Sequence, residues 1–168
     1  YQQRKVVYRN LRDGRFEDIS ERLGAPITTP RAGRGSAFGD FDNNGTTDVL
    51  VNNVNDLPDL FSLDDASGHH WLTLKLVGSV SNRSAIGARV RSVSANGTQV
   101  EEVRGGGSYA SQNDLRVHFG LGVATRTDLQ VRWPNGLEER FMDVAADRIL
   151  TLTEGTGTGA TPGVGGQR

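Results

Sequence analysis

Short apolar segments separated by turn residues are the feature that most restricts the fold of this chain. Within Trp71–Val77, apolar side chains alternate with polar ones, and this period of two is typical of a β-strand that buries one face. The Asn96-Gly97 pair predicts a type I′ turn, because both central residues of that turn have positive φ. Seven such segments with turns between them predict an antiparallel β-sandwich. The predicted segments are residues 71–77, 88–95, 98–104, 115–119, 129–133, 137–142 and 148–153.

A second group of shorter strand signals precedes the sandwich. The turn pair Asp13-Gly14 separates two short apolar runs, and strands near Ser36–Phe41 and Asp48–Asn53 flank a strongly acidic loop. The polar stretch 64–70 is the predicted junction between the two groups. The sequence therefore predicts an all-β chain with a small β-module, a β-sandwich and a flexible Gly/Thr-rich tail, over residues 1–65, 66–154 and 155–168.

Composition excludes several classes of function. The chain has no cysteine, which excludes thiol catalysis, disulfides and Cys-ligated zinc. Its 19 basic and 20 acidic residues are interspersed, so we expect no binding to nucleic acid. No apolar run approaches the ~18 residues that a membrane-spanning helix needs. The chain starts at Tyr1 without a signal peptide, and we expect it to be a processed product or a piece of a larger protein.

The segment from Asp40 to Asp48 carries the clearest chemistry. Oxygen-bearing side chains occupy its positions 1, 3, 5 and 9, and Gly45 at position 6 allows a sharp bend. Calcium is a hard cation that takes six to eight oxygen ligands, and a loop of this spacing wraps around one ion. The predicted ligands are Asp40, Asp42, Asn44, the carbonyl of Thr46, and Asp48.

Other interpretations of this loop are less favoured. Magnesium requires a rigid octahedral shell, and zinc prefers His or Cys, which the loop lacks. The loop differs from an EF-hand, because Val51 stands where that motif has a bidentate Glu. An Asx-rich turn without a metal is the alternative, since Asp, Asn and Gly favour turns in any case.

The remaining polar and aromatic residues form no coherent catalytic group, so we expect no enzyme activity. His69, His70 and His118 are interpreted as solvated or hydrogen-bonded structural residues. Asn82 and Asn96 each begin an N-x-S/T triplet and are candidate glycan acceptors. A polar ligand-binding edge is a further candidate, and conformational support of the loop is its alternative. The residues of that edge are Tyr109, Gln112, Asn113, Asp114 and Trp133.

Two parts of the sequence resemble known families. Ala37–Asn53 resembles one FG-GAP (VCBS) repeat of integrin-α-like propellers, and residues 8–18 resemble the closing half of a preceding repeat. The later part resembles an ASPIC/UnbV domain, through residues 82–90, 106–114, 118–122 and 131–136. The resemblance implies a partial propeller blade, because a propeller needs roughly four to eight blades. It also implies calcium binding at the acidic loop, although the repeat usually has Asp where Asn44 stands.

These observations together predict a non-catalytic, calcium-binding structural or interaction module of a secreted or cell-surface protein, with a role in adhesion or assembly. The expected partner is another protein, or a second copy that pairs through exposed β-edges. A carbohydrate-binding module is the alternative, with Tyr109 and Trp133 as contact residues. An enzyme domain is the least favoured.

Overall fold

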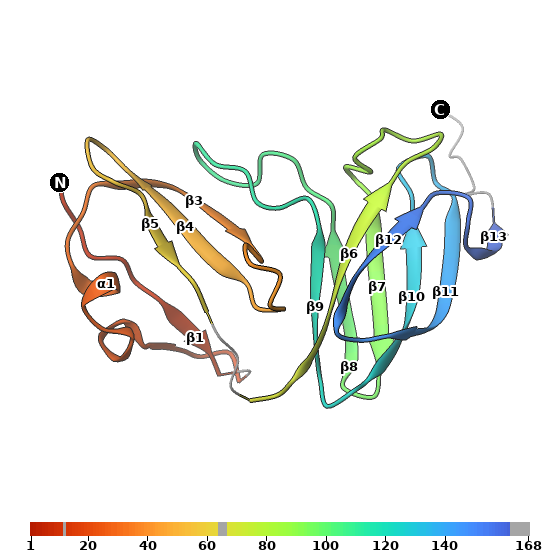
Figure 1. Ribbon diagram of the computed structural model, residues 1–168, viewed down its shortest axis with the longest axis horizontal. Coiled ribbons are helices and arrows are strands. Elements are labelled where there is room, and N and C mark those ends of the chain that lie inside the picture. The colour runs from red at the N-terminus through yellow and green to blue at the C-terminus, as the bar shows by residue number, and fades with distance from the viewer. Residues whose placement is uncertain (12, 64–66, 162–168) are drawn as a thin grey trace.

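The computed structural model describes residues 1–11, 13–63 and 67–161, and it shows two groups of β-sheets (Figure 1). The first group contains a hairpin and a three-stranded sheet, and we call it the N-terminal module. Its strands are β1 (Tyr8–Asn10), β2 (Phe16–Asp18), β3 (Gly33–Gly39), β4 (Asp48–Asn53) and β5 (Asp59–Phe61). The prediction of an all-β chain is confirmed.

Two short helical turns lie between β2 and β3: η1 (Ser20–Leu23) and α1 (Ala25–Thr28). Pro26 lies in the first turn of α1, where its fixed φ suits a helix and its missing N–H costs no hydrogen bond. Ile27 of α1 is buried, so the helix supplies apolar packing to a small module. No helix in the described residues is long and apolar enough to cross a membrane.

The second group is the predicted β-sandwich. One sheet has the order β13-β11-β10-β7-β8, and the other has the order β12-β6-β9. Strand β12 pairs with β6 in parallel, whereas the other described pairs are antiparallel. The strands are β6 (His70–Val77), β7 (Arg89–Ser94), β8 (Gly97–Glu102), β9 (Val117–Gly122), β10 (Arg126–Arg132), β11 (Glu138–Ala145), β12 (Arg148–Thr153) and β13 (Thr158–Thr161).

The core lies between these two sheets. Alternate residues of the strands point inward, as the period of two requires, and Leu72, Phe119, Leu129 and Trp133 are at most 1% exposed. The Trp133 indole N–H donates to the carboxylate of buried Glu139 at 2.5 Å. The ring is therefore a core residue with a satisfied polar end.

The sequence predicts a flexible tail over residues 155–168, and this prediction is wrong for the first residues of that segment. Glu139 accepts hydrogen bonds from the backbone N–H groups of Gly155 and Gly157, and these bonds fix the turn that follows β12. The chain then forms β13, which pairs with β11 and becomes the edge strand of the five-stranded sheet. The buried carboxylate of Glu139 thus orders a Gly-rich segment whose composition alone predicts flexibility. Residues 162–168 lie outside the described part of the chain.

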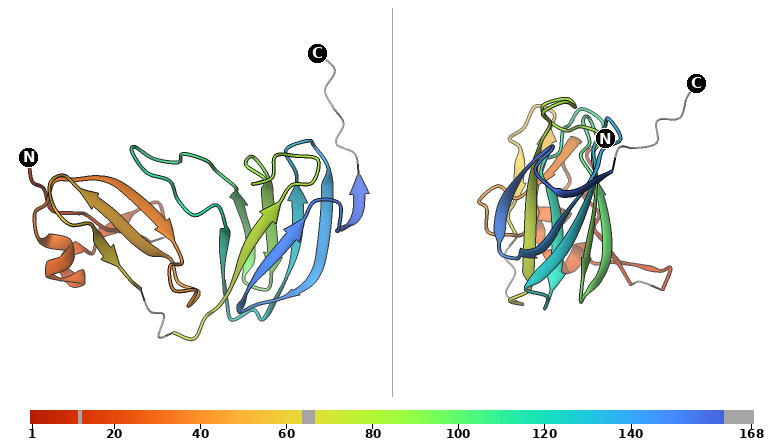
Figure 2. Two further views of the ribbon diagram at one scale, coloured as in Figure 1. Left: turned by 45° about the horizontal axis from the view of Figure 1, so that its top comes forward. Right: turned by 90° about the vertical axis from the view of Figure 1, so that its right-hand side faces the viewer.

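A long loop of the sandwich reaches over to the N-terminal module. This crossing loop, residues 103–116, joins β8 to β9 and lies beside β3 (Figures 1 and 2). The Asp114 N–H donates to the Phe38 carbonyl at 2.9 Å, and the Phe38 N–H donates to Asn113 Oδ1 at 3.1 Å. A Cβ on Gly35 would overlap the Ala110 carbonyl, so the backbones meet without a side chain between them. The outer edge of β3 is thereby covered.

Candidate metal centre

The acidic loop connects β3 to β4 and closes their antiparallel hairpin. Carboxylate oxygens of Asp40, Asp42 and Asp48 all lie within 4.8 Å of one another. Asp40 is 5% exposed and Asp48 is 2% exposed, whereas Asp42 faces solvent. Gly45 adopts φ +91°, a conformation that glycine tolerates best, and it makes the bend that brings the three carboxylates together.

This geometry fits a calcium ion. Two oxygens bound to the same ion at about 2.3–2.6 Å can be at most about 5 Å apart, and the three carboxylates satisfy that limit. Within the described residues, no Lys, Arg or His forms an ion pair with any of the three. Three crowded negative charges, two of them buried, therefore lack a cationic partner from the described chain.

Backbone N–H groups hold these carboxylates in place. Asp40 accepts from the N–H groups of Asn44 and Gly45, both at 3.0 Å. Asp48 accepts from Phe41 at 2.8 Å and from Leu63 at 2.9 Å. An ionised carboxylate offers about four lone-pair directions, so each group retains the capacity to bind a cation.

The structure brings together three of the five predicted ligands. The side-chain oxygen of Asn44 accepts from the N–H and the hydroxyl of Thr46, and its amide donates to Asp42 at 3.0 Å. The Thr46 hydroxyl also donates to the Leu63 carbonyl. Asn44 thus stabilises the loop around the carboxylates, and ligation by Asn44 and by the Thr46 carbonyl stays a prediction.

Arg116 of the crossing loop contacts the backbone of the acidic loop. Its guanidinium donates to the Asp40 carbonyl and to Asn43 Oδ1, both at 2.8 Å, and its Nε donates to Asp114 at 2.5 Å. Arg116 is a residue of the site that the sequence did not reveal. Nothing in the sequence marks a contact between residues 73 positions apart.

Trp71 of β6 provides a second contact with the acidic loop. Gly45 is buried against its indole ring, and a Cβ at position 45 would overlap the indole nitrogen. Two independent constraints therefore favour glycine at position 45: the positive φ angle, and the lack of space for a Cβ beside the Trp71 ring. The candidate metal centre lies against the sandwich rather than on a free loop.

The histidines lie near the acidic loop without forming a metal site. His118 stacks on Trp71 with ring centroids 6.2 Å apart, and its Nδ1 lies 2.9 Å from the Thr73 hydroxyl. Burial lowers the pKa of His118 below its ordinary 6.5, although nearby Asp40 opposes this change. His70 Nδ1 lies 2.7 Å from a carboxylate oxygen of Asp147. Among the described residues, the acidic loop alone brings three metal-binding side chains together.

The predicted ligand-binding edge is not assembled as one surface. Gln112 bonds to backbone groups of its own loop, and Asn113 and Asp114 bond to β3 or Arg116. Tyr109 is 75% exposed, but Trp133 is 1% exposed and faces the core. Burial of Trp133 removes it as a contact residue, and the other polar residues support the crossing loop instead.

The two candidate glycan acceptors differ in their surroundings. Both are exposed. The amide of Asn82 bonds in both directions to the backbone of Ile86, at 2.8 and 2.9 Å, whereas Asn96 lies at the hairpin turn between β7 and β8. Glycosylation at either stays a prediction.

Two family models match successive segments of the chain, one in each of the two groups of sheets. Residues 1–51 match the family model described as FG-GAP-like repeat, and residues 78–159 match the one described as ASPIC and UnbV. The segment similar to the FG-GAP-like repeat contains the whole acidic loop, and the segment similar to the ASPIC and UnbV model contains Arg116.

The chain is a distant relative of cartilage acidic protein 1. It is 23% identical to that protein of Homo sapiens over 141 residues, which are 79% of this chain and 20% of the human protein. It is 26% identical to the Xenopus tropicalis protein over 113 residues, which are 62% of this chain and 16% of that protein. The chain therefore spans about a fifth of the length of these curated relatives.

Proposed function

We propose that the acidic loop binds one calcium ion and that the chain is a non-catalytic structural or interaction module of an extracellular protein. The convergence of the Asp40, Asp42 and Asp48 carboxylates within 4.8 Å carries this proposal. When bound, calcium supplies the positive charge that these side chains lack. The loop residues orient the carboxylates, and Arg116 and Trp71 position the loop against the sandwich.

Calcium is expected to raise the thermal stability of the chain. Extracellular calcium modules bind with a Kd of about 10⁻⁴–10⁻³ M, so 10 mM calcium is expected to stabilise the folded chain by roughly 1.4–2.7 kcal/mol. The melting temperature should rise by several degrees relative to a chelator-treated sample. Scanning calorimetry on both samples measures the difference.

Two variants separate a specific site from a general salt effect. Asp48→Asn removes a buried carboxylate of the loop and should abolish the calcium-dependent shift. Asp13→Asn removes a carboxylate from a turn outside the candidate site and should retain the shift. Identical melting curves for the parent chain with calcium and with chelator would contradict the proposal.

The proposed location rests on the families rather than on chemistry. Similarity to cartilage acidic protein 1 and to FG-GAP repeats supports an extracellular or cell-surface protein. The absence of cysteine is compatible with either side of a membrane. Cell-surface labelling or assay of the culture medium in the source organism tests this location.

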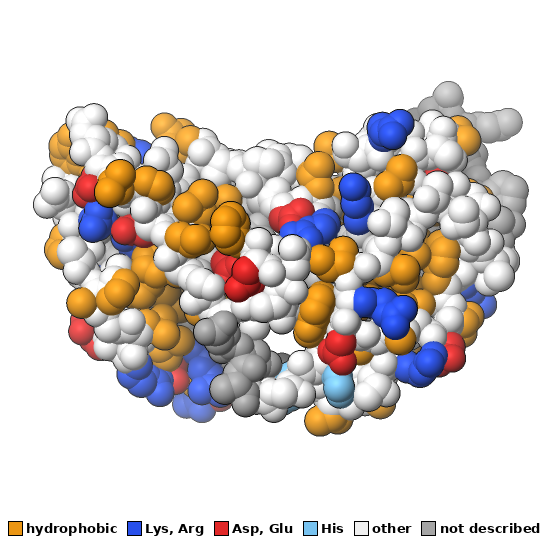
Figure 3. All heavy atoms as spheres, in the orientation of Figure 1, with side chains coloured by type: hydrophobic (Ala, Val, Ile, Leu, Met, Phe, Trp, Pro, Cys, Tyr) orange, Lys and Arg blue, Asp and Glu red, His pale blue; other side chains and the backbone are white. Residues whose placement is uncertain are grey.

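An exposed apolar row supports the interaction role. Ala37, Leu50 and Leu60 are in register across β3, β4 and β5, and Leu50 and Leu60 are 43% and 49% exposed. Figure 3 shows apolar side chains gathered over this module. We propose a protein partner, or a second copy of the chain, at this sheet. Sedimentation velocity over a hundredfold concentration range tests self-association. A monomer at every concentration would exclude a second copy of the chain and leave a different protein as the proposed partner.

The carbohydrate-binding alternative has little support. It depended on Tyr109 and Trp133 as an aromatic contact surface, and Trp133 is in the core. A single exposed tyrosine on the crossing loop does not form a stacking platform.

A further inference from the structure

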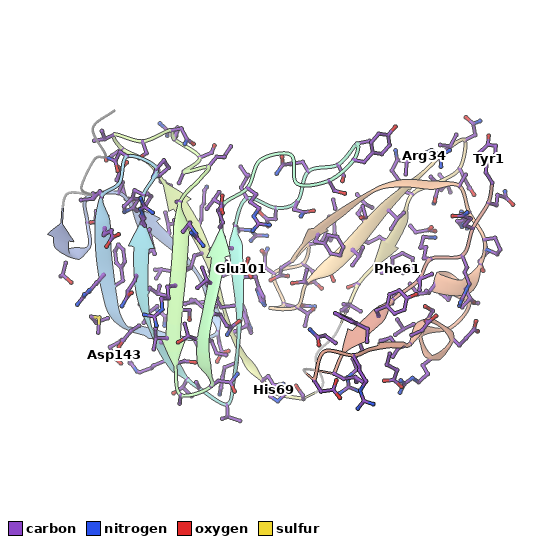
Figure 4. All side chains as sticks on the ribbon, turned by 180° about the vertical axis from the view of Figure 1, so that it is seen from behind. Tyr1, Arg34, Phe61, His69, Glu101 and Asp143 are labelled. Carbon is purple, nitrogen blue, oxygen red and sulfur yellow. The ribbon has the colours of Figure 1, made fainter. Side chains whose placement is uncertain are left out.

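Four arginines that are scattered along the sequence meet on the outer face of the five-stranded sheet. Arg89 and Arg91 come from β7, Arg132 from β10 and Arg140 from β11. Arg132 lies directly opposite Arg89, and Gln130 lies between Arg91 and Arg140. All four side chains are exposed, and Figure 4 shows this outer face toward the viewer. We call these four residues the arginine face.

The arginine face carries positive charge without matching partners. Within the described part of the chain, none of its guanidinium groups lies in an ion pair, and Arg91 donates a hydrogen bond to the neutral side chain of Gln130 at 3.3 Å. Glu102 and Glu138 stand at the ends of one cross-strand row, opposite Arg89 and Arg132. Asp128 lies on the same face, two residues before Gln130 in β10, so three carboxylates against four guanidinium groups leave an excess of one positive charge.

Of the other arginines that the structure describes, six form ion pairs and five do not, namely Arg9, Arg34, Arg83, Arg104 and Arg148. Those with a carboxylate partner are Arg4, Arg15, Arg22, Arg31, Arg116 and Arg126. Like charges directly opposite each other on neighbouring strands destabilise a sheet. The pair Arg89–Arg132 is repulsive in itself, although Glu102 and Glu138 on its outer sides offset part of the repulsion, and an anion between the two guanidinium groups would offset the rest.

The shape of the surface favours an extended ligand. The four arginines line a depression of about 250 Å³ together with Val100, Gln130 and two acidic residues, Glu138 and Glu139. Neighbouring strands lie about 4.8 Å apart and alternate residues of one strand about 6.8 Å apart, so the guanidinium groups form a small grid rather than a pocket around one ion. Each guanidinium can hold an oxyanion through two parallel hydrogen bonds.

We propose that the arginine face binds the sulfate groups of a sulfated polysaccharide. A peptide ligand would use a sheet edge or apolar pockets, and the arginines lie on a face, mostly in interior strands. A single-stranded nucleic acid would use aromatic side chains for stacking, and no aromatic residue of the described chain lines this depression. A linear polysaccharide with regularly spaced sulfate groups can match the spacing of the four guanidinium groups, and it needs neither a sheet edge with apolar pockets nor aromatic residues for stacking.

The test uses the full chain and a heparin-derived octasaccharide as the probe. Calorimetric titration at physiological salt should show binding that weakens steadily as salt increases, because ionic contacts are screened. The double variant Arg91→Gln, Arg132→Gln should bind at least about tenfold more weakly, since charge-assisted hydrogen bonds are lost on two strands. The matched control Arg9→Gln, Arg83→Gln removes the same charge from sites away from this sheet and should change the affinity less than about twofold.

Each outcome decides the proposal. Equal losses in the two double variants would show attraction to overall charge and overturn it, as would absence of octasaccharide binding to the parent chain. Binding of a chemically desulfated octasaccharide with equal affinity, or tighter binding of an oligoglutamate of equal charge, would also overturn it. Melting curves check that both variants fold. The octasaccharide titration is repeated in calcium and in chelator, so that failure of this proposal can be distinguished from failure of the calcium proposal.

Discussion

Replacement of Glu154 by alanine is expected to destabilise the sandwich by about 3 kcal/mol, and to lower its melting temperature by about 10 °C or more. Glu154 is 3% exposed and accepts from three consecutive backbone N–H groups, those of Ser79, Val80 and Ser81, at 2.8–2.9 Å. Asn135 donates to its other oxygen at 2.6 Å. Without the carboxylate, these four donors lose their shared acceptor.

The same interaction predicts a dependence on pH. Burial alone would raise the pKa of Glu154, but the N–H donors of residues 81, 80 and 79 outweigh it and hold the pKa below its ordinary 4.5. A depressed folded-state pKa means that the stabilisation is complete above about pH 4.5 and is lost as the pH falls through the folded-state value. The stability difference between the parent chain and Glu154→Gln should therefore shrink in acid.

Chemical denaturation at pH 7 and at pH 3.5 measures both effects. Glu101→Gln is the control, because Glu101 is exposed on β8 (Figure 4) and should change stability by less than about 0.5 kcal/mol. A Glu154→Ala chain as stable as the control at pH 7 would show that the carboxylate does not anchor the turn.

Replacement of Gly45 by alanine is the second large effect that we expect. The new Cβ would overlap the Trp71 indole ring and would also force a non-glycine residue into φ +91°. The backbone strain alone costs about 1–2 kcal/mol, and displacement of the indole adds to it. The acidic loop should move away from the sandwich and lose its contacts with Arg116. Small-angle X-ray scattering should then show a larger radius of gyration, and calcium affinity should fall.

Gly14→Ala separates strain from the loss of this contact. Gly14 has a similar φ of +83° in the β1–β2 turn, and no atom of the described chain lies within 4 Å of the point that an added Cβ would occupy. This control should lose stability through strain but keep the parent radius of gyration and calcium affinity. Equal scattering curves for all three chains would mean that Trp71 does not position the acidic loop.

Local sequence signals predicted most of the strands. The alternation in Trp71–Val77 depends on neighbouring residues and appears as expected in β6. The hairpin predicted at Asn96-Gly97 also forms, between β7 and β8, but its turn is not the predicted type I′, because Ser94 pairs with Gly97 and Asn96 does not have positive φ. The three aspartates of the acidic loop also come together, because a nine-residue turn confines them wherever the rest of the chain lies. Short-range geometry is therefore readable from one sequence.

Long-range contacts account for what the sequence did not reveal. Trp133 has the alternating pattern of any strand residue, and only the arrangement of the two sheets decides that it is buried. Strand β13 is formed from a Gly/Thr-rich stretch whose order depends on the distant carboxylate of Glu139. The arginine face likewise depends on the order β11-β10-β7, which places Arg91 beside Gln130, 39 positions further along the chain.

The cover on the edge of β3 has a consequence for the newly made chain. Asn113 follows Phe38 by 75 residues, and at about 5–20 residues per second a ribosome takes roughly 4–15 s to add that length. During this interval the strand can expose its unpaired N–H and C=O groups to other nascent chains. Protein synthesis thus leaves a period in which a chaperone, rather than the sandwich, must shield this strand.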